Sequence, residues 1–283
     1  NYAYVSCYKS GFAIINIQNP TMPLIESYTK TNKETHDIVI KGNIAYLANP
    51  EGVSIYNIQN HNSPTLENEF NFTGGYPAPY TITLPPQDLT NNILYYNTAR
   101  NLYTLDITNP TEPVVVHQEE FNQNSGNGYT WATPVFKNNY MYVANNMALH
   151  IYDISNPASP QLVYESLDCF TRTIYSIAIN GNMLILTHWQ QGWGTIDISN
   201  PINPQLIHYY SQTYGTGFGA AALEENTLYL NNDQKGNNAG WRVRIIDITD
   251  PENAVLQGQI EPNEEGYVCS HEIIKKNNNT YAI

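Results

Sequence analysis

The feature that most constrains the fold of this chain is one turn motif, which occurs six times in the sequence. The fourth copy lies in the segment LHIYDISNPASPQLV at 149–163. The copies occupy residues 16–23, 57–64, 106–113, 153–160, 197–204 and 247–254, at intervals of 41 to 50 residues. A unit that recurs at such a period indicates a repeat architecture, so we expect six similar supersecondary units.

Each copy has an Asn or Asp at the end of a strand and a second one three residues later. The first set is Asn16, Asn57, Asp106, Asp153, Asp197 and Asp247, and the second is Asn19, Asn60, Asn109, Asn156, Asn200 and Asp250. Proline follows the second set in every copy except the second, which has His61. Asn and Asp side chains form hydrogen bonds with nearby backbone groups, and proline fixes φ at a value that suits a turn. The motif therefore predicts a tight turn. Because all copies share it, we interpret these residues as scaffold and not as catalytic groups.

Four short strands are predicted around each turn. In the second repeat they span 36–40, 44–48, 53–58 and 65–70, and all are rich in β-branched and aromatic residues. No segment has a sustained helical period, so helix content should be very low. Four strands in every repeat are the signature of a propeller blade. We therefore predict an all-β fold, a six-bladed β-propeller of four-stranded antiparallel blades, with residues 1–283 as one domain.

The segment YVANNMALHIYDISNPASPQLV at 142–163 resembles the LVIVD-repeat family, whose repeats have this strand–DISNPxxP–strand form. The resemblance covers nearly the whole chain. It implies a β-propeller on a bacterial or archaeal surface or exported protein. It supplies no catalytic residue.

The two ends of the chain are expected to meet. The first repeat begins at its second strand, YAYVS, while SHEIIKK at 270–276 matches THDIVIKG at 35–42. We therefore expect the C-terminal strand to complete the first blade and close the ring, which would remove an open sheet edge. NTYAI at 279–283 starts a further copy of the second strand, so part of a seven-bladed propeller is the alternative.

In such blades the repeated turn lies at one end of each sheet. The loops between strands two and three and those leading into strand one lie at the other end, here called the variable face. The candidate ligand-binding residues of this face are Trp131, Trp189, Trp193, Trp241, Tyr80, Tyr175, Tyr129 and Tyr214. Aromatic rings among Asn, Gln and Gly suit a protein surface or a glycan. The alternative is that these rings serve packing.

Two innermost strands start with a histidine and a carboxylate, His36 with Asp37 and His271 with Glu272. If the ring closes, the four side chains could hold a divalent metal ion at the channel mouth. Adjacent strand residues point to opposite faces, which favours the alternative that each pair bonds to neighbouring backbone. The sequence requires no other cofactor.

The composition of the chain argues against some classes of binding partner. The chain has 25 Asp and Glu against 12 Lys and Arg, a net charge of −13 without a basic cluster, so nucleic acid is not expected. No apolar run approaches the roughly 20 residues that cross a bilayer, so we expect no membrane insertion in this segment. An acidic chain with only Cys7, Cys169 and Cys269 fits an exported protein, extracellular or at the cell surface. It opens at NYAYVS, inside a strand pattern, so signal and anchor segments are expected outside it.

The sequence has no G-x-S-x-G, no H-E-x-x-H and no P-loop, which favours a non-enzymatic role. Our leading hypothesis is an extracellular or cell-surface propeller that binds a protein or glycan through its variable face. One alternative is a metal-dependent binding protein or hydrolase-type enzyme at the channel mouth. The other is a structural subunit of a surface assembly, which would associate with itself.

Overall fold

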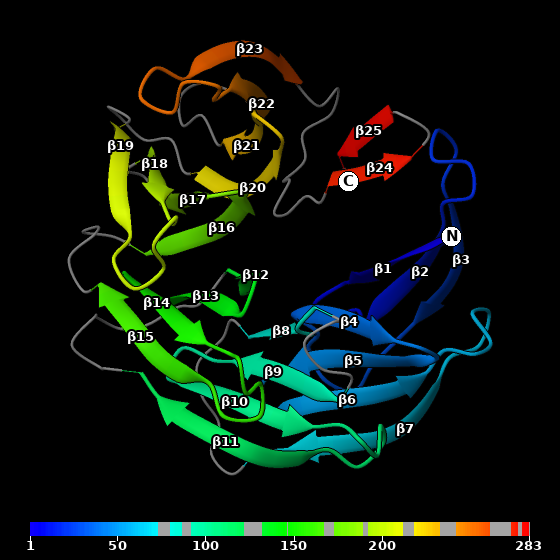
Figure 1. The fold of residues 1–283 in the computed structure, drawn as a ribbon. Coiled ribbons are helices and arrows are strands. Elements are labelled where there is room, and N and C mark those ends of the chain that lie inside the picture. Colours follow the sequence, from blue (N-terminus) through cyan, green and yellow to red (C-terminus); the bar gives the residue numbers. More distant parts are fainter. Residues whose placement is uncertain are drawn as a thin grey trace. The chain divides into compact units, whose positions relative to one another are not determined.

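The structure is a computed structural model of the whole chain (Figure 1). It describes residues 1–72, 80–86, 92–121, 132–145, 147–166, 173–188, 192–211, 218–232, 242–260, 273–276 and 279–282. The chain divides into two compact units. The first contains Asn1–Pro134 with Asp153–Gln161, and the second contains Val135–Tyr152 with Leu162–Ile283. The single domain expected over 1–283 stays a prediction.

The first unit holds three antiparallel sheets, in which the strands follow one another in chain order (Figure 1). The first sheet contains β1 (Tyr2–Ser6), β2 (Phe12–Asn16) and β3 (Leu24–Thr29). The second contains β4 (Asp37–Lys41), β5 (Ile44–Asn49), β6 (Gly52–Asn57) and β7 (Thr65–Asn71). The third contains β8 (Thr81–Thr83), β9 (Ile93–Asn97), β10 (Asn101–Asp106) and β11 (Val114–Glu120).

The second unit holds three sheets of four strands and one of two. They are β12 (Val135–Lys137), β13 (Tyr140–Asn145), β14 (Ala148–Asp153) and β15 (Gln161–Ser166); β16 (Ile174–Asn180), β17 (Met183–His188), β18 (Gly192–Asp197) and β19 (Gln205–Ser211); β20 (Phe218–Glu224), β21 (Thr227–Asn232), β22 (Arg242–Asp247) and β23 (Val255–Ile260); and β24 (Ile273–Lys276) with β25 (Asn279–Ala282). The described residues contain no helix, as predicted. Within this part of the chain, nothing has the length and apolar character of a membrane-spanning helix.

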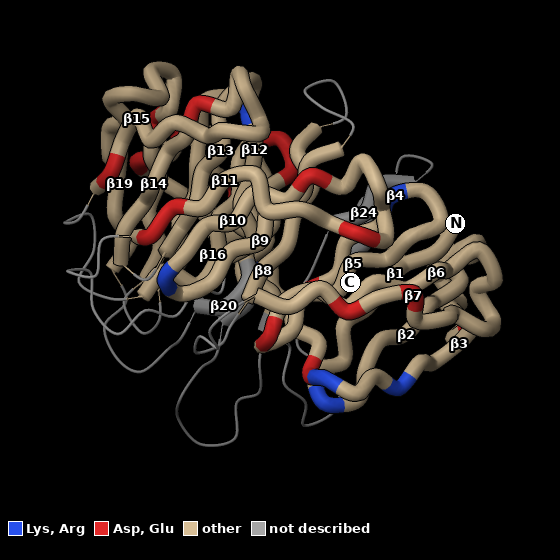
Figure 2. Tube along the Cα trace, turned by 90° about the horizontal axis from the view of Figure 1, so that it is seen from below, with Lys and Arg blue, Asp and Glu red and all other residues tan. Residues whose placement is uncertain are grey.

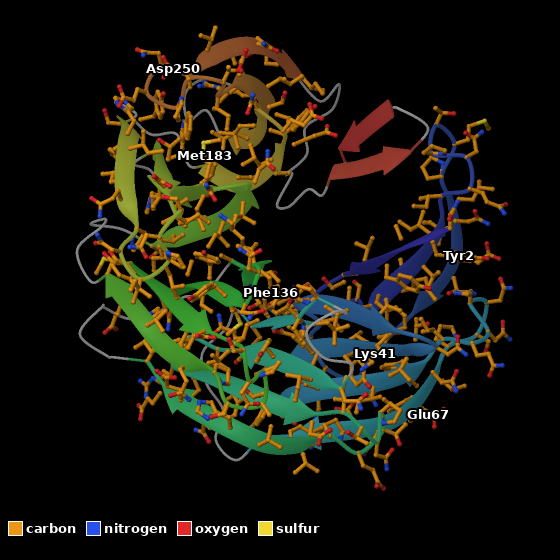
Figure 3. All side chains as sticks on the ribbon, viewed as in Figure 1. Tyr2, Lys41, Glu67, Phe136, Met183 and Asp250 are labelled. Carbon is orange, nitrogen blue, oxygen red and sulfur yellow. The ribbon has the colours of Figure 1, made fainter. Side chains whose placement is uncertain are left out.

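Burial decreases from the middle strands of a sheet to the outermost strand. In the second sheet β5 and β6 are almost wholly buried, while Glu67 on β7 is exposed (Figure 3). The buried strands are apolar on both faces because neighbouring sheets stack: Tyr46 and Ile55 share a core with Ile82 and Leu105 of the third sheet. Most of the described trace carries none of the four charged residue types (Figure 2). The core shared by the second and third sheets is apolar, so its burial stabilises their stacking.

The C-terminal strands pair differently from the expectation. β24 pairs with β25 in a sheet of their own, and the sheet of β1 to β3 keeps three strands. The expected completion of the first blade by 270–276 is therefore wrong for the described strands. Ile274 lies opposite Tyr281, the register that Val39 and Tyr46 have in β4 and β5. The pair thus repeats strands one and two of a blade, and pairing with the next strand in sequence costs less closure entropy than pairing with β1.

Candidate functional site

The repeated turn forms as its sequence predicts. In all six copies the Oδ1 atom of the first Asn or Asp accepts the N–H two residues later, at 2.7 to 3.0 Å. In all six copies the carbonyl oxygen of the second one accepts the N–H three residues later. Hydrogen bonds from the next Thr or Ser also lower the pKa of the Asp106, Asp153 and Asp247 carboxyls. The end of the sheets that carries these turns uses its polar groups for its own structure.

A tyrosine hydroxyl holds the proline carbonyl of a turn that lies far away in sequence. Tyr46 Oη donates to the Pro110 carbonyl at 3.0 Å. Where the proline is absent the contact changes: Tyr4 Oη lies 3.0 Å from Nε2 of His61, which occupies the proline position. In the second unit Tyr210 Oη donates to the Pro251 carbonyl at 2.9 Å. The carbonyl at the repeated proline position therefore accepts a hydrogen bond from a distant tyrosine, a contact that the turn sequence alone does not show.

The aromatic candidates of the variable face divide into two groups. Five of the eight lie outside the described residues: Trp131, Trp189, Trp241, Tyr129 and Tyr214. Of the other three, Trp193 is 3% exposed and Tyr80 is 2% exposed, while Tyr175 is half-buried. Trp193 lies inside β18 and stacks on Tyr210 with ring centroids 4.1 Å apart. Trp193 and Tyr80 thus serve packing, the alternative that the sequence left open.

Asp37, a candidate metal ligand, is bound to neighbouring backbone and to a threonine. Its Oδ1 atom accepts the N–H of Ile38 at 2.8 Å. Its Oδ2 atom accepts the N–H of Ile82 at 3.0 Å and the hydroxyl of Thr133 at 3.1 Å. The carboxylate therefore links β4 to the start of β8. This is the role that strand alternation favoured.

His36 has separate surroundings. Its ring lies between Tyr8 and Tyr80, with centroids 5.3 and 5.2 Å away, and both contacts are nearly perpendicular. Its Nε2 atom is 3.8 Å from Glu34 Oε2. Burial lowers the pKa of His36 although Glu34 acts to raise it, so the imidazole is neutral at pH 7. The described residues contain no group of three His, Cys, Asp or Glu side chains that could hold a metal ion. His271 and Glu272 lie outside them, so the metal site stays a prediction.

The structure gathers three residues around His36 that sequence reasoning missed. Tyr8 is 50% exposed, and Lys9 Nζ lies 5.4 Å from the centre of its ring. Lys9 Nζ is also 3.7 Å from Glu34 Oε1. We call Tyr8, Lys9, Glu34, His36 and Tyr80 the His36 cluster. The cluster lies on or next to the loops 7–11 and 30–36, which belong to the variable face. Their place on this face was the one feature of the sequence that pointed to the cluster.

A second polar group on the same face is internally paired. Lys33 Nζ lies 2.7 Å from Glu69 Oε2 and 2.9 Å from Glu51 Oε2, and it donates to Asn71 Oδ1 at 2.6 Å. Partial burial acts to lower the pKa of Lys33, but the hydrogen bonds and charges of Glu69 and Glu51 outweigh it and raise the pKa. These groups satisfy one another and offer less to a ligand than the His36 cluster.

Cys7 carries a free, half-buried thiol, and burial raises its pKa. Cys169 and Cys269 lie outside the described residues.

Solved structures share this fold at low sequence identity. A protein from Lactobacillus plantarum superposes with a TM-score of 0.74 at 10% identity, over 91% of this chain and 81% of that one. The computationally designed Ika8 protein gives 0.66 at 12% identity, over 100% and 77% of the two chains. BamB from Moraxella catarrhalis gives 0.64 at 12% identity, over 99% and 76%. The predicted all-β propeller of antiparallel blades is confirmed.

No curated protein sequence matches the chain. The LVIVD repeat, in contrast, matches residues 1–30, 33–71, 128–168 and 172–212, together more than half of the chain. The matched segments contain the turns at 16–23, 57–64, 153–160 and 197–204. The chain therefore belongs to the LVIVD repeat family, as the resemblance implied.

Proposed function

We propose that this chain is a non-catalytic binding module of an exported or cell-surface protein, and that it recognises a protein or glycan through its variable face. One contrast carries the proposal. At the repeated-turn end, the same side-chain and backbone atoms are used for internal hydrogen bonds in all six copies. At the variable face, exposed groups such as Tyr8 and Lys9 stand on stacked sheets.

The fold supports this role. Variable loops on a rigid β-scaffold can differ from blade to blade without cost to the core, and binding residues concentrate on such loops. The buried faces of β5 and β6, by contrast, are committed to packing. The location outside the cell rests on the composition and on the family resemblance.

Tryptophan emission tests the proposal. In a Trp193→Phe background the buried tryptophan no longer contributes, and the signal comes from Trp131, Trp189 and Trp241. We expect a saturable shift with oligosaccharides or with purified surface proteins. Alanine at Trp189 and Trp241 should abolish it, while Gln205→Ala, an exposed change beside a repeated turn, should leave it unchanged. No shift with any probe, together with self-association in sedimentation, would favour the structural-subunit alternative.

A further inference from the structure

We propose that the His36 cluster is a carbohydrate site, in which one neutral sugar ring packs on Tyr8 while its hydroxyls bond to Glu34 and Lys9. This inference rests on the proposed function and names a ligand class and a place for it. Three observations carry it: an unfavourable backbone conformation at Tyr8, the bonds that hold it, and the polar groups around the ring.

Tyr8 has a backbone conformation that an aromatic residue rarely adopts. Among the described residues, Tyr8, Asn138 and Glu225 are the non-glycine residues with positive φ, at 50°, 50° and 48°. Asn138 and Glu225 lie in the tight turns between strands one and two, which require this conformation. Tyr8 lies in the loop between β1 and β2, and glycine would relieve its strain. Strain kept at one exposed residue points to a function there.

The fold holds Tyr8 in place through a buried residue. Thr35 is 2% exposed, and its N–H donates to the Tyr8 carbonyl at 3.0 Å. The Thr35 hydroxyl lies 3.2 Å from the same carbonyl. Inside the loop, Cys7 N donates to the Gly11 carbonyl at 2.7 Å. The backbone of Tyr8 is therefore held in place before a ligand arrives, which lowers the entropy cost of binding.

The groups around the ring suit a sugar. Half of Tyr8 is exposed, so its ring offers an apolar body with a polar tip. Glu34 accepts hydrogen bonds through two oxygens, and Lys9 donates through an ammonium 3.7 Å from it. Nε2 of His36 is buried and lies 3.8 Å from Glu34 Oε2, so the imidazole backs this carboxylate and leaves its outer side to a ligand. A ring that combines apolar and hydroxyl faces uses all of these groups.

Other ligand classes fit less well. Loops 7–11 and 30–36 read CYKSG and KTNKETH, without one aliphatic side chain. The core of a protein interface needs apolar anchors, which these loops lack apart from Tyr8. A nucleic acid or another polyanion would meet Glu34 and a chain of net charge −13. A neutral glycan remains.

Titration calorimetry and NMR with trisaccharides of glucose, N-acetylglucosamine, mannose and galactose test the site. Tyr8→Gly should weaken binding of the saccharide that the parent chain binds by about tenfold or more, because it removes the packing ring. The same change should keep or raise Tm, because it relieves strain. Asn138→Gly is the control: it places glycine at the same φ with a smaller relief of strain, because Asn tolerates this conformation, and it lies at the repeated-turn end and should not change binding.

Glu34→Gln tests the polar part of the site. It keeps the shape of the side chain but removes its negative charge and one of its two acceptor oxygens. We expect a several-fold loss of affinity with unchanged Tm. If Tyr8→Gly and Glu34→Gln bind like the parent while tryptophan variants of the other loops lose binding, the His36 cluster is not the site and the proposed function stands. If the parent binds none of the saccharides, the carbohydrate site is overturned, and the protein partner of the proposed function is tested separately.

Discussion

The Tyr95 hydroxyl donates a 2.9 Å hydrogen bond to the carbonyl oxygen of Pro157. Tyr95 lies on β9, and Pro157 lies in the fourth copy of the repeated turn, within the same compact unit. The turn motif and the strand-two tyrosine are therefore two halves of one contact. Burial raises the pKa of Tyr95, so the hydroxyl stays a donor at any physiological pH.

Removing this hydroxyl should destabilise the protein. Tyr95→Phe leaves the partly buried Pro157 carbonyl without its donor, and we expect a loss of about 1–2 kcal/mol in the free energy of unfolding. Urea denaturation followed by far-UV circular dichroism measures it. Tyr56→Phe is the control, because among the described residues the Tyr56 hydroxyl makes no hydrogen bond, and its loss should be much smaller. Equal losses in both variants would show that the hydrogen bond from Tyr95 to Pro157 contributes nothing to stability.

The exceptional turn, which has His61 in place of proline, allows a second test. His61 stacks on Tyr2 with ring centroids 4.0 Å apart and contacts the Tyr4 hydroxyl. His61→Ala removes both contacts and should cost about 1 kcal/mol. His61→Pro should cost less, because proline presets φ for the turn. Thermal melts of the two variants give their order of stability. A His61→Pro variant that is less stable than His61→Ala would contradict the prediction.

Local chemistry explains how much of the fold could be predicted from sequence. The six turns depend on contacts between residues two or three apart, such as Asp106 with Thr108, and these contacts are visible in the sequence. The β24–β25 pair was harder, because β1 and β25 are copies of the same strand and the pattern cannot choose between them.

The candidate site was less predictable, for two reasons. Trp193 lies between Gly192 and Gly194, which read as a loop. Gly192 instead lies in β18, where an added Cβ would come 1.9 Å from the Tyr210 carbonyl oxygen, so this glycine serves close strand packing. The His36 cluster needs Tyr8 to meet His36 and Lys9 to meet Glu34 across a long separation in sequence, which no local pattern encodes.

The same close approach predicts the effect of a methyl group at Gly52. A Cβ there would lie 2.1 Å from the Phe70 carbonyl oxygen, and φ is +153°. Because the clash is with backbone, Gly52→Ala should cost about 3 kcal/mol or more. Gly42→Ala is the control: its φ is also positive, but an added Cβ meets nothing within 4 Å, so we expect about 1 kcal/mol. Chemical denaturation of both variants measures the two losses in the free energy of unfolding. Similar losses would show that β6 and β7 move apart easily.

His150 should make the protein less stable in mild acid. Burial lowers its pKa in the folded state to about 4 from an ordinary value of 6.5. The unfolded chain therefore takes up a proton as pH falls through 6.5, while the folded chain does so only near 4. This contribution to stability is complete above pH 6.5 and is lost as pH falls between these values, by up to about 3 kcal/mol. His150→Gln removes the titration, so its unfolding free energy should fall less between pH 7 and pH 4 in urea melts. An unchanged pH dependence would mean that Glu165, 3.8 Å from Nδ1, stabilises the charged imidazole enough to offset its burial.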